Sequence, residues 1–384
     1  MEIELSLNGT VYRVDPCQIS VDTSLNTFIR EHAKLKGTKF MCLEGGCGSC
    51  VVSVSRVHPV TRRVVTRSVN SCLLPVYSCH GADIVTVEGI GSKSAGYHPI
   101  QRRLASFHGS QCGFCSPGMV MNMYGLLEGS ANGVTMREVE DALDGNVCRC
   151  TGYRPILDAF KTFARDVNPG VVRGCQDIED LGKCPVKICS SGCTPLVEEP
   201  RMACTVDGDG RQWFKVYTIV EVFEVFGEIG DLPYMLVAGN TAHGVYRRRD
   251  DLQVFVDISS VEKLHGRCVG HDAMTIGASV TLSEFIGIME DSTVCNPRYQ
   301  YLEKVAKHVK LVANQSVRNS GTIAGNLMIK HQHPEFPSDI FLLLETVGAM
   351  IVIGKSMVKL LTFSISDPFS NSHHPDQCIS TGVS

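Results

Sequence analysis

The residues best suited to chemistry are the cysteines, of which the chain has 18. No Lys/Arg-then-apolar segment follows Met1, so the sequence predicts no secretory signal and a reducing compartment, where disulfides are rare. Cysteine at this density therefore indicates metal or redox chemistry. Two sets of four have regular spacing: Cys42, Cys47, Cys50 and Cys72 form the first set, and Cys112, Cys115, Cys148 and Cys150 form the second.

The first set has the spacing C-x4-C-x2-C, with its fourth cysteine 22 positions further on. That arrangement is typical of plant-type 2Fe-2S sites. Gly45, Gly46 and Gly48 lie between the cysteines, and without a Cβ they let backbone N–H groups approach the sulfurs. Structural zinc is the alternative, but zinc sites favour paired C-x2-4-C knuckles. We therefore expect the first set to hold a 2Fe-2S cluster.

The second set is less specific when it is judged by spacing alone. It consists of C-x2-C and, after 32 intervening residues, C-x-C. A zinc site, a redox dithiol made by Cys112 and Cys115, and a second iron-sulfur cluster all remain open. Both pairs fall at the edges of expected helices, where N-terminal amides favour thiolates.

A third candidate site follows an expected strand near Met235–Ala238. Consecutive amides at Gly239, Asn240 and Thr241 are suited to cradling a diphosphate. An ordinary turn at the end of a strand is the alternative. No G-x-G-x-x-G occurs in this region, so the residues themselves do not support a Rossmann site.

The composition limits what can position these sites. The 384 residues predict two to three domains. A net charge of −4 lacks the basic character of a nucleic-acid binder, and no apolar run approaches the ~18 residues of a membrane span. We expect a soluble cytoplasmic protein with no nucleic-acid or membrane partner.

The hydrophobic pattern predicts an α+β multidomain chain. Residues 1–88 show strands around Asn8-Gly9, a short helix at Thr23–His32 and later strands, whereas residues 89–165 are helical. Residues 166–208 are expected to be a linker, and residues 209–354 a second α+β domain. Residues 355–384, rich in Ser, His, Pro and Asp, are expected to be a divergent, disordered tail. Capping boxes are expected at Thr135–Glu138, Thr218–Glu221 and Thr281–Glu284.

Three long motifs resemble the molybdenum hydroxylases, the xanthine dehydrogenase and aldehyde oxidase family. They are Phe40–Cys50, Gln111–Gly118 and Gly145–Pro155. The resemblance covers about residues 1–350, and details such as Met41-Cys-Leu-Glu are most similar to insect-type aldehyde oxidases. It implies a β-grasp plant-type ferredoxin domain at 1–88 and a helical-bundle domain at 89–165 whose four cysteines hold a second 2Fe-2S cluster.

The resemblance also implies further cofactor contacts. Gln111 matches a residue that hydrogen-bonds molybdopterin, and residues 209–354 resemble a truncated FAD-binding (PCMH-like) domain. The residues that the resemblance assigns to FAD are Leu236, Val237, Ala238, Gly239, Asn240, Thr241, Ala242, His243, Gly325, Asn326 and Asp339.

By this likeness, the chain is the electron-transfer part of a molybdenum hydroxylase. Electrons would pass from molybdenum through two 2Fe-2S clusters to FAD and then to oxygen or NAD. The molybdopterin domain is missing, so no residue of this chain is expected to be catalytic, and molybdopterin would come from a missing domain or a partner. A homodimer or pairing with a molybdenum-bearing chain is expected. The alternatives are a two-cluster electron carrier without FAD, or a non-catalytic truncated product that pairs with the full-length enzyme.

Three other features are interpreted as structural. Arg247–Arg249 is suited to steering an anionic cofactor, but a solvated charge run is preferred. Met119 and Met123 are expected in the core rather than at a cofactor. His331 and His333 are expected on the surface.

Overall fold

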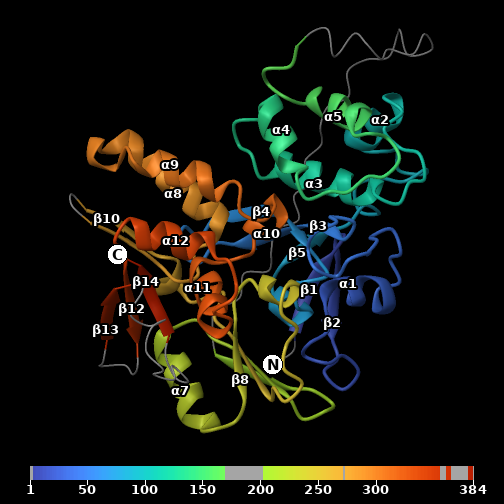
Figure 1. The fold of residues 1–384 in the computed structure, drawn as a ribbon. Coiled ribbons are helices and arrows are strands. Elements are labelled where there is room, and N and C mark those ends of the chain that lie inside the picture. The colour runs from blue at the N-terminus through green and yellow to red at the C-terminus, as the bar shows by residue number, and fades with distance from the viewer. Residues whose placement is uncertain (1–2, 169–201, 271–272, 355–359, 365–378, 384) are drawn as a thin grey trace.

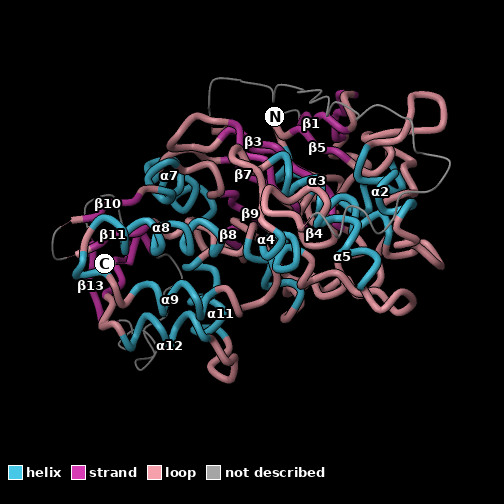
Figure 2. The backbone as a smooth tube through the Cα atoms, turned by 90° about the horizontal axis from the view of Figure 1, so that it is seen from above, coloured by secondary structure: helices cyan, strands magenta, loops and turns pink. Residues whose placement is uncertain are grey.

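A computed structural model describes residues 3–168, 202–270, 273–354, 360–364 and 379–383. The chain forms three parts in sequence order (Figure 1). In two perpendicular views the helices α2 (Pro99–Ser106) and α5 (Arg154–Lys161) lie on one side of the molecule. The helices α9 (Leu302–Val309) and α12 (Asp339–Thr346) lie on the other (Figure 1, Figure 2). The N-terminal sheet lies between them.

The first part is a five-stranded mixed sheet with the order β2-β1-β5-β3-β4. Only β1 and β5 pair in parallel; the other neighbours are antiparallel. Its elements are β1 (Ile3–Leu7), β2 (Thr10–Val14), α1 (Leu25–Thr27), the π-helical turn η1 (Phe28–His32), β3 (Val51–Val57), β4 (Val64–Asn70), the 3-10 turn η2 (Val76–Cys79) and β5 (Asp83–Val85).

Local signals account for most of this sheet. Asn8 and Gly9 both have positive φ (53° and 80°), as a tight hairpin between β1 and β2 requires, which confirms the predicted turn. Alternate β1 residues are buried in the core, and Ser24 caps the helix expected within 23–32. Strand β4 was not predicted, because Arg67 and Asn70 interrupt its apolar pattern. Both side chains bond elsewhere: Arg67 to the third part and Asn70 to the first cysteine loop.

The second part is helical and packs on the first sheet. Besides α2 and α5 it contains α3 (Ser116–Glu128) and α4 (Met136–Ala142), and the predicted capping box of Thr135 and Glu138 starts α4. Helix α3 lies against β3 and β4, and a Cβ at Gly118 would lie 2.1 Å from the Gly48 carbonyl oxygen. Met119 and Met123 are buried in the core of this part, as expected.

The third part begins with a four-stranded sheet of order β6-β7-β9-β8 and helix α7 (Ile219–Ile229). Its strands are β6 (Ala203–Val206), β7 (Gln212–Lys215), β8 (Tyr234–Val237) and β9 (Val254–Asp257). The predicted linker 166–208 is therefore too long, because β6 starts within it: this short strand pairs antiparallel with β7. The capping box of Thr218 and Glu221 that starts α7 is confirmed.

The third part continues with a second sheet of order β10-β11-β14-β12-β13, which is accompanied by helices. The strands are β10 (Arg267–Val269), β11 (Met274–Ile276), β12 (Met350–Gly354), β13 (Leu360–Ser364) and β14 (Ile379–Val383). The other helical elements of this part are the 3-10 turns η4 (Thr241–Gly244), η5 (Glu262–His265) and η6 (Pro297–Tyr299), and the helices α8 (Leu282–Cys295), α10 (Gln315–Arg318) and α11 (Ile323–Gln332).

The start of α8 and the segment 355–384 can both be compared with the predictions from the sequence. The capping box of Thr281 and Glu284 is confirmed at the start of α8. The expectation of a disordered tail over 355–384 is wrong at β13 and β14, which pair antiparallel with β12. The expectation rested on composition, whereas these two segments contain the apolar and β-branched residues that strands favour.

The first and third parts share one hydrophobic core. Trp213, Val237 and Phe255 of the third part pack with the buried residues of the N-terminal sheet. The indole of Trp213 lies 5.6 Å from the ring of Tyr77 and 6.0 Å from that of Phe255, centroid to centroid. The two parts are thus docked through buried apolar surface. Among the described residues, none of the helices has the length and apolarity needed to cross a bilayer.

Candidate iron-sulfur and flavin sites

The first cysteine set gathers in the loop between η1 and β3 and at the end of β4. Cys47, Cys50 and Cys72 are buried, with 4%, 1% and 7% of their surface exposed, and Cys42 is half-buried. The Sγ atoms of Cys50 and Cys72 are 3.4 Å apart, and the Glu44 N–H donates to the Cys42 Sγ over 3.4 Å. The structure therefore brings together cysteines that lie 22 positions apart in the chain.

The electrostatics of this set show how closely its thiols interact. The pKa of Cys50 is raised well above its usual value, first by the hydrogen bond with Cys72 and then by burial. Burial would also raise the pKa of Cys47, but hydrogen bonds with Cys42 and Ser49 outweigh it and lower that pKa. Contacts thus link Cys50 with Cys72 and Cys47 with Cys42.

The second set lies in two loops of the helical part. Cys112 and Cys115 precede α3, and Cys148 and Cys150 precede α5. Cys148 is buried, Cys115 is half-buried, and Cys112 and Cys150 are exposed. Thiol hydrogen bonds join Cys112 to Cys150 and Cys115 to Cys148, so residues from both loops form one group.

Thiolate formation in the second set is favoured at one position and disfavoured at another. Burial, followed by the contact with Cys148, raises the pKa of Cys115 to about 12. Burial would also raise the pKa of Cys148, but hydrogen bonds from Thr151 and the Cys150 backbone lower it to about 7. The Thr151 Oγ1 lies 3.1 Å from the Cys148 Sγ. Four convergent thiols with local donors suit a metal or cluster that needs four thiolates.

The two cysteine sets are held together by hydrogen bonds that their spacing in the sequence does not predict. The Val147 N–H donates to the Cys47 carbonyl oxygen over 2.9 Å, one residue before Cys148. The buried Asn146 amide donates to the Gly48 carbonyl over 3.2 Å and accepts from Asn122 over 2.6 Å. Asn146 lies inside the predicted motif Gly145–Pro155, and no other feature of the sequence points to its contact with the loop of the first cysteine set.

The first set is also fixed to the third part of the chain. The Asn240 amide donates to the Leu73 carbonyl oxygen over 2.6 Å, next to Cys72. The Asn314 amide donates to the Gly45 carbonyl oxygen over 2.8 Å. Nothing in the sequence pattern pointed to Asn314, because it lies 269 positions from its acceptor. The loop around the first set therefore contacts both other parts of the chain.

The predicted diphosphate loop follows β8 and leads into η4. A Cβ at Gly239 would lie 1.7 Å from the Ser320 carbonyl oxygen, so only glycine fits between the two segments. Asn240 adopts a left-handed conformation (φ 56°), and its buried Oδ1 has no hydrogen-bond partner among the described residues. An unfilled acceptor beside the amides of this partly buried loop suits a polar ligand such as FAD.

The other residues assigned to FAD are only partly brought to this loop. Gly325 and Asn326 lie in the first turn of α11, which contacts η4, and the Ser338 hydroxyl donates to Asn326. Asp339 begins α12, where its carboxylate lies 3.7 Å from His308 of α9. The carboxylate of Asp339 thus faces α9 rather than the loop at residues 236–243. Gln111 is exposed, beside Cys112.

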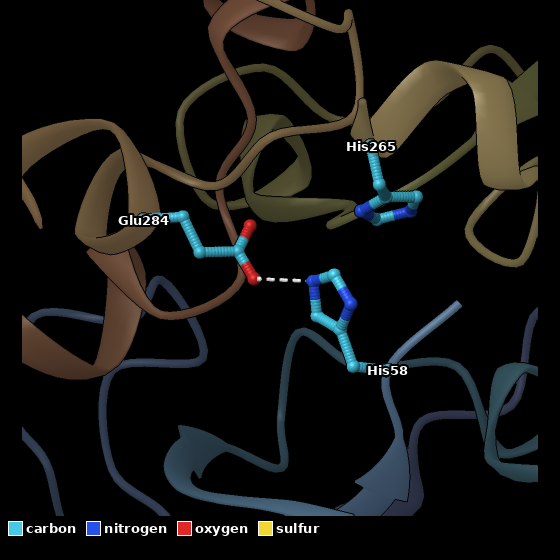
Figure 3. Close-up of side chains that lie close together, drawn as sticks. All are labelled: His58, His265 and Glu284. Atoms are coloured by element: carbon cyan, nitrogen blue, oxygen red, sulfur yellow. Dashed lines mark ion pairs between the residues drawn. The ribbon is translucent and has the colours of Figure 1, made fainter. Parts of the chain in front are cut away.

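A third cluster, of His58, His265 and Glu284, has possible ligand atoms within 4.8 Å of one another (Figure 3). Its hydrogen bonds argue against a metal site. The Val60 and Thr61 N–H groups both donate to the His58 Nδ1, so the proton is on Nε2, which lies 3.3 Å from the Glu284 carboxylate.

The Glu284 carboxylate also accepts hydrogen bonds from two other groups. Arg67 donates to its Oε1 over 3.0 Å, and the Thr281 N–H donates to its Oε2 over 2.9 Å. Burial would raise the pKa of Glu284, but the hydrogen bond with His58 and the charge of Arg67 lower it to about 2. The cluster is therefore an electrostatic contact between the first and third parts.

The smaller sequence features are also placed. Arg247 and Arg249 are exposed, as expected of a solvated run, but Arg248 is half-buried. Its guanidinium lies over Phe255, 5.6 Å from the ring centroid. His333 is partly exposed and stacks on Tyr246 with 3.6 Å between the ring centroids.

Three family models match the chain. They describe a 2Fe-2S iron-sulfur cluster binding domain at residues 13–77, a 2Fe-2S binding domain at residues 86–161, and an FAD binding domain in molybdopterin dehydrogenase at residues 208–377. The chain therefore contains two 2Fe-2S-binding domains followed by an FAD-binding domain. The last match runs through β13, which is consistent with an ordered strand at this position.

Curated relatives are similar over almost the whole chain. An indole-3-acetaldehyde oxidase of Arabidopsis thaliana is 34% identical over 383 residues, which covers 93% of this chain and 28% of that protein. An abscisic-aldehyde oxidase of Arabidopsis thaliana is 34% identical, with 91% of this chain and 27% of that protein covered. A probable aldehyde oxidase 2 of Oryza sativa is 36% identical, with 91% of this chain and 28% of that protein covered. The chain thus spans little more than a quarter of their length.

Solved structures are similar to smaller stretches. Quinoline 2-oxidoreductase from Pseudomonas putida 86 matches with 32% identity and a TM-score of 0.34, covering 44% of this chain and 93% of that one. The aldehyde oxidoreductase from Desulfovibrio gigas matches with 30% identity and a TM-score of 0.36, and the match covers 42% of this chain and 16% of that one.

Proposed function

Because the chain belongs to the molybdenum hydroxylase family, we propose that it is the electron-transfer region of an aldehyde oxidase-like enzyme. In this role it passes electrons from a molybdenum centre through two 2Fe-2S clusters to FAD. The chain's own residues hold the cofactors, set the distances between them and exclude water around the first cluster.

One observation carries this proposal: the loop of the first cysteine set touches both of the other sites. Val147, beside the second set, donates to the Cys47 carbonyl oxygen over 2.9 Å. Asn240, in the diphosphate loop, donates to the Leu73 carbonyl oxygen over 2.6 Å. The first cysteine set therefore lies between the second set and the flavin loop, and this order suits a linear path for electrons.

The finer assignments belong to the same proposal. Cys42, Cys47, Cys50 and Cys72 are the ligands of the cluster in a β-grasp ferredoxin domain, in keeping with the β2-β1-β5-β3-β4 sheet. Cys112, Cys115, Cys148 and Cys150 are the ligands of the other cluster, in a helical bundle. The flavin contacts are Leu236–His243 with Gly325 and Asn326. Asp339 is proposed as a residue near the site and not as a direct flavin contact, because its carboxylate faces His308 of α9.

A molybdenum-bearing partner is proposed on the side of the second set. Gln111, Cys112 and Cys150 are exposed there, so they are accessible to molybdopterin held by another domain or chain. Oxygen or NAD is the proposed acceptor of electrons from FAD.

Analysis of the anaerobically purified chain tests the proposal. Iron, acid-labile sulfide, zinc and acid-released flavin are measured per chain. We expect iron and sulfide for two 2Fe-2S clusters and one FAD. Iron without flavin would indicate a two-cluster carrier, and zinc bound by the second set in place of iron would contradict the proposed path.

A further inference from the structure

A basic cavity lies where the first and third parts meet, with Asp22 of the first part and His243 of η4 among its lining residues. It has a volume of about 310 Å3, and four arginines and two aspartates contribute to its wall. The residues that line it are Asp22, Arg211, His243, Arg247, Arg248, Arg249, Asp250, Leu252 and Phe255. Neither the family models nor the proposed electron path assigns it a role.

Three of the four arginines already have acceptors. Arg211 contacts Asp22 and Asp209 at 3.0 Å each and Asp207 at 3.3 Å. The Nε of Arg249 donates to Asp251 over 2.9 Å. Arg247 is exposed and donates to the carbonyl oxygen of Leu43 over 3.4 Å. Their charges are compensated or solvated.

Arg248 is different. Its Nε is buried without a hydrogen-bond partner, and no carboxylate of the described residues forms an ion pair with its guanidinium. One face of the guanidinium is covered by the Phe255 ring. Burial, which is the largest effect, lowers the pKa of Arg248 despite the attraction of Asp22. A half-buried guanidinium that no carboxylate contacts directly is costly, so a cavity beside it suits a negatively charged ligand.

His243 provides a directional donor in the same cavity. Its Nδ1 accepts the backbone N–H of Arg248 over 3.3 Å, so in the neutral ring Nε2 carries the proton. Burial and the neighbouring Arg248 and Arg247 lower the pKa of His243 to about 4, which keeps the ring neutral at pH 7. A neutral N–H and a guanidinium that has no direct ion pair together match a phosphate group.

We propose that this cavity is a second ligand site, which binds a phosphate ester of mononucleotide size through Arg248 and His243. The volume is near the lower end of the ~300–1,000 Å3 of small-molecule sites, and Leu252 and Phe255 supply an apolar wall for a sugar or base. The FAD diphosphate is assigned to the amides around Gly239, where the loop faces Ser320, and His243 at the end of this loop would contact both ligands.

Calorimetric titration of the flavin-loaded full chain with ADP tests this site. Arg248→Gln should weaken ADP binding by about tenfold or more, because it removes a charge-assisted contact. The matched control is Arg267→Gln, which removes an equal charge from the same part of the chain at a residue that pairs with Asp291 and does not line the cavity; it should leave ADP binding unchanged. Equal affinities of wild type and Arg248→Gln would overturn the site. ADP binding only to flavin-free chain would also overturn it, because the cavity would then belong to the flavin.

A measurement on the wild-type chain does not depend on the folding of a variant. Phenylglyoxal modifies arginines, and the modified positions are mapped by mass spectrometry. ADP should protect Arg248 and leave the modification of Arg267, which does not line the cavity, unchanged. Failure of saturating ADP to protect Arg248 would overturn the proposal.

Discussion

The contact between Arg67 and Glu284 should contribute substantially to the docking of the flavin domain on the first sheet. Its N···O distance is 3.0 Å, and the two side chains are 24% and 19% exposed. The pKa of Glu284 falls from 4.5 to about 2, because the contacts with His58 and Arg67 and the capping N–H outweigh burial. At ~1.4 kcal/mol per pH unit, this shift corresponds to about 3 kcal/mol.

Glu284→Gln keeps the shape of the side chain and its ability to cap α8 but removes the charge. We expect the free energy of unfolding to fall by about 3 kcal/mol at pH 7. A double-mutant cycle with Arg67→Met should give a coupling of about 1.5 kcal/mol for the pair alone. Trp213, the single tryptophan, is a suitable probe, because its indole packs between Tyr77 of the first part and Phe255 of the third.

The matched control is the pair Arg62–Glu262, which joins the same two parts at the same 3.0 Å but is 62% and 57% exposed. Solvent screening should reduce its coupling to about 0.5 kcal/mol or less. The pH dependence gives a further check. The folded pKa lies below the unfolded one, so the stabilisation is complete above pH 4.5 and is lost as the pH falls toward 2. Equal couplings for the two pairs, or an effect of Glu284→Gln that is as large at about pH 3 as at pH 7, would refute the reasoning.

Three further predictions concern the cofactor sites. Cys150→Ser should remove one of two paramagnetic signals of the reduced chain and leave the other, and loss of both or of neither would contradict the ligand assignment. Gly239→Ala should lower flavin content and cost about 2 kcal/mol or more, because its Cβ would lie 1.7 Å from the Ser320 carbonyl oxygen; the control is Gly227→Ala in α7, where nothing lies within 4 Å and alanine should leave flavin content unchanged and stabilise the helix slightly. His243, with a pKa of about 4, should show no NMR titration between pH 5.5 and 8, and a midpoint near 6.5 would show that its ring is not buried beside Arg248. Because that folded pKa lies below 6.5, His243 should reduce stability as the pH falls from about 6.5 toward 4.

Local sequence signals predicted much of the fold and both cysteine groups. Capping boxes depend on residues three positions apart, and those at Thr135, Thr218 and Thr281 are all present. The C-x4-C-x2-C spacing is likewise local, and the structure gathers its cysteines with Cys72.

Contacts between domains could not be predicted in the same way. Asn314 and Gly45 are 269 positions apart, and Arg67 and Glu284 are 217 apart. Their pairing is set by how folded parts dock, which has no period or motif in the chain. Arg248 shows the same limit: in sequence it belongs to a charge run, and only the packing of Phe255 beneath it distinguishes it from Arg249.

The central claim is that two clusters and one flavin on this chain form a connected electron path. Anaerobic reductive titration of the purified chain, followed by absorbance and by paramagnetic resonance, tests it most directly. We predict about four reducing equivalents per chain, one for each 2Fe-2S cluster and two for FAD, and two distinct cluster signals. Uptake of about one equivalent, with a single cluster signal and no flavin bleaching, would contradict the account.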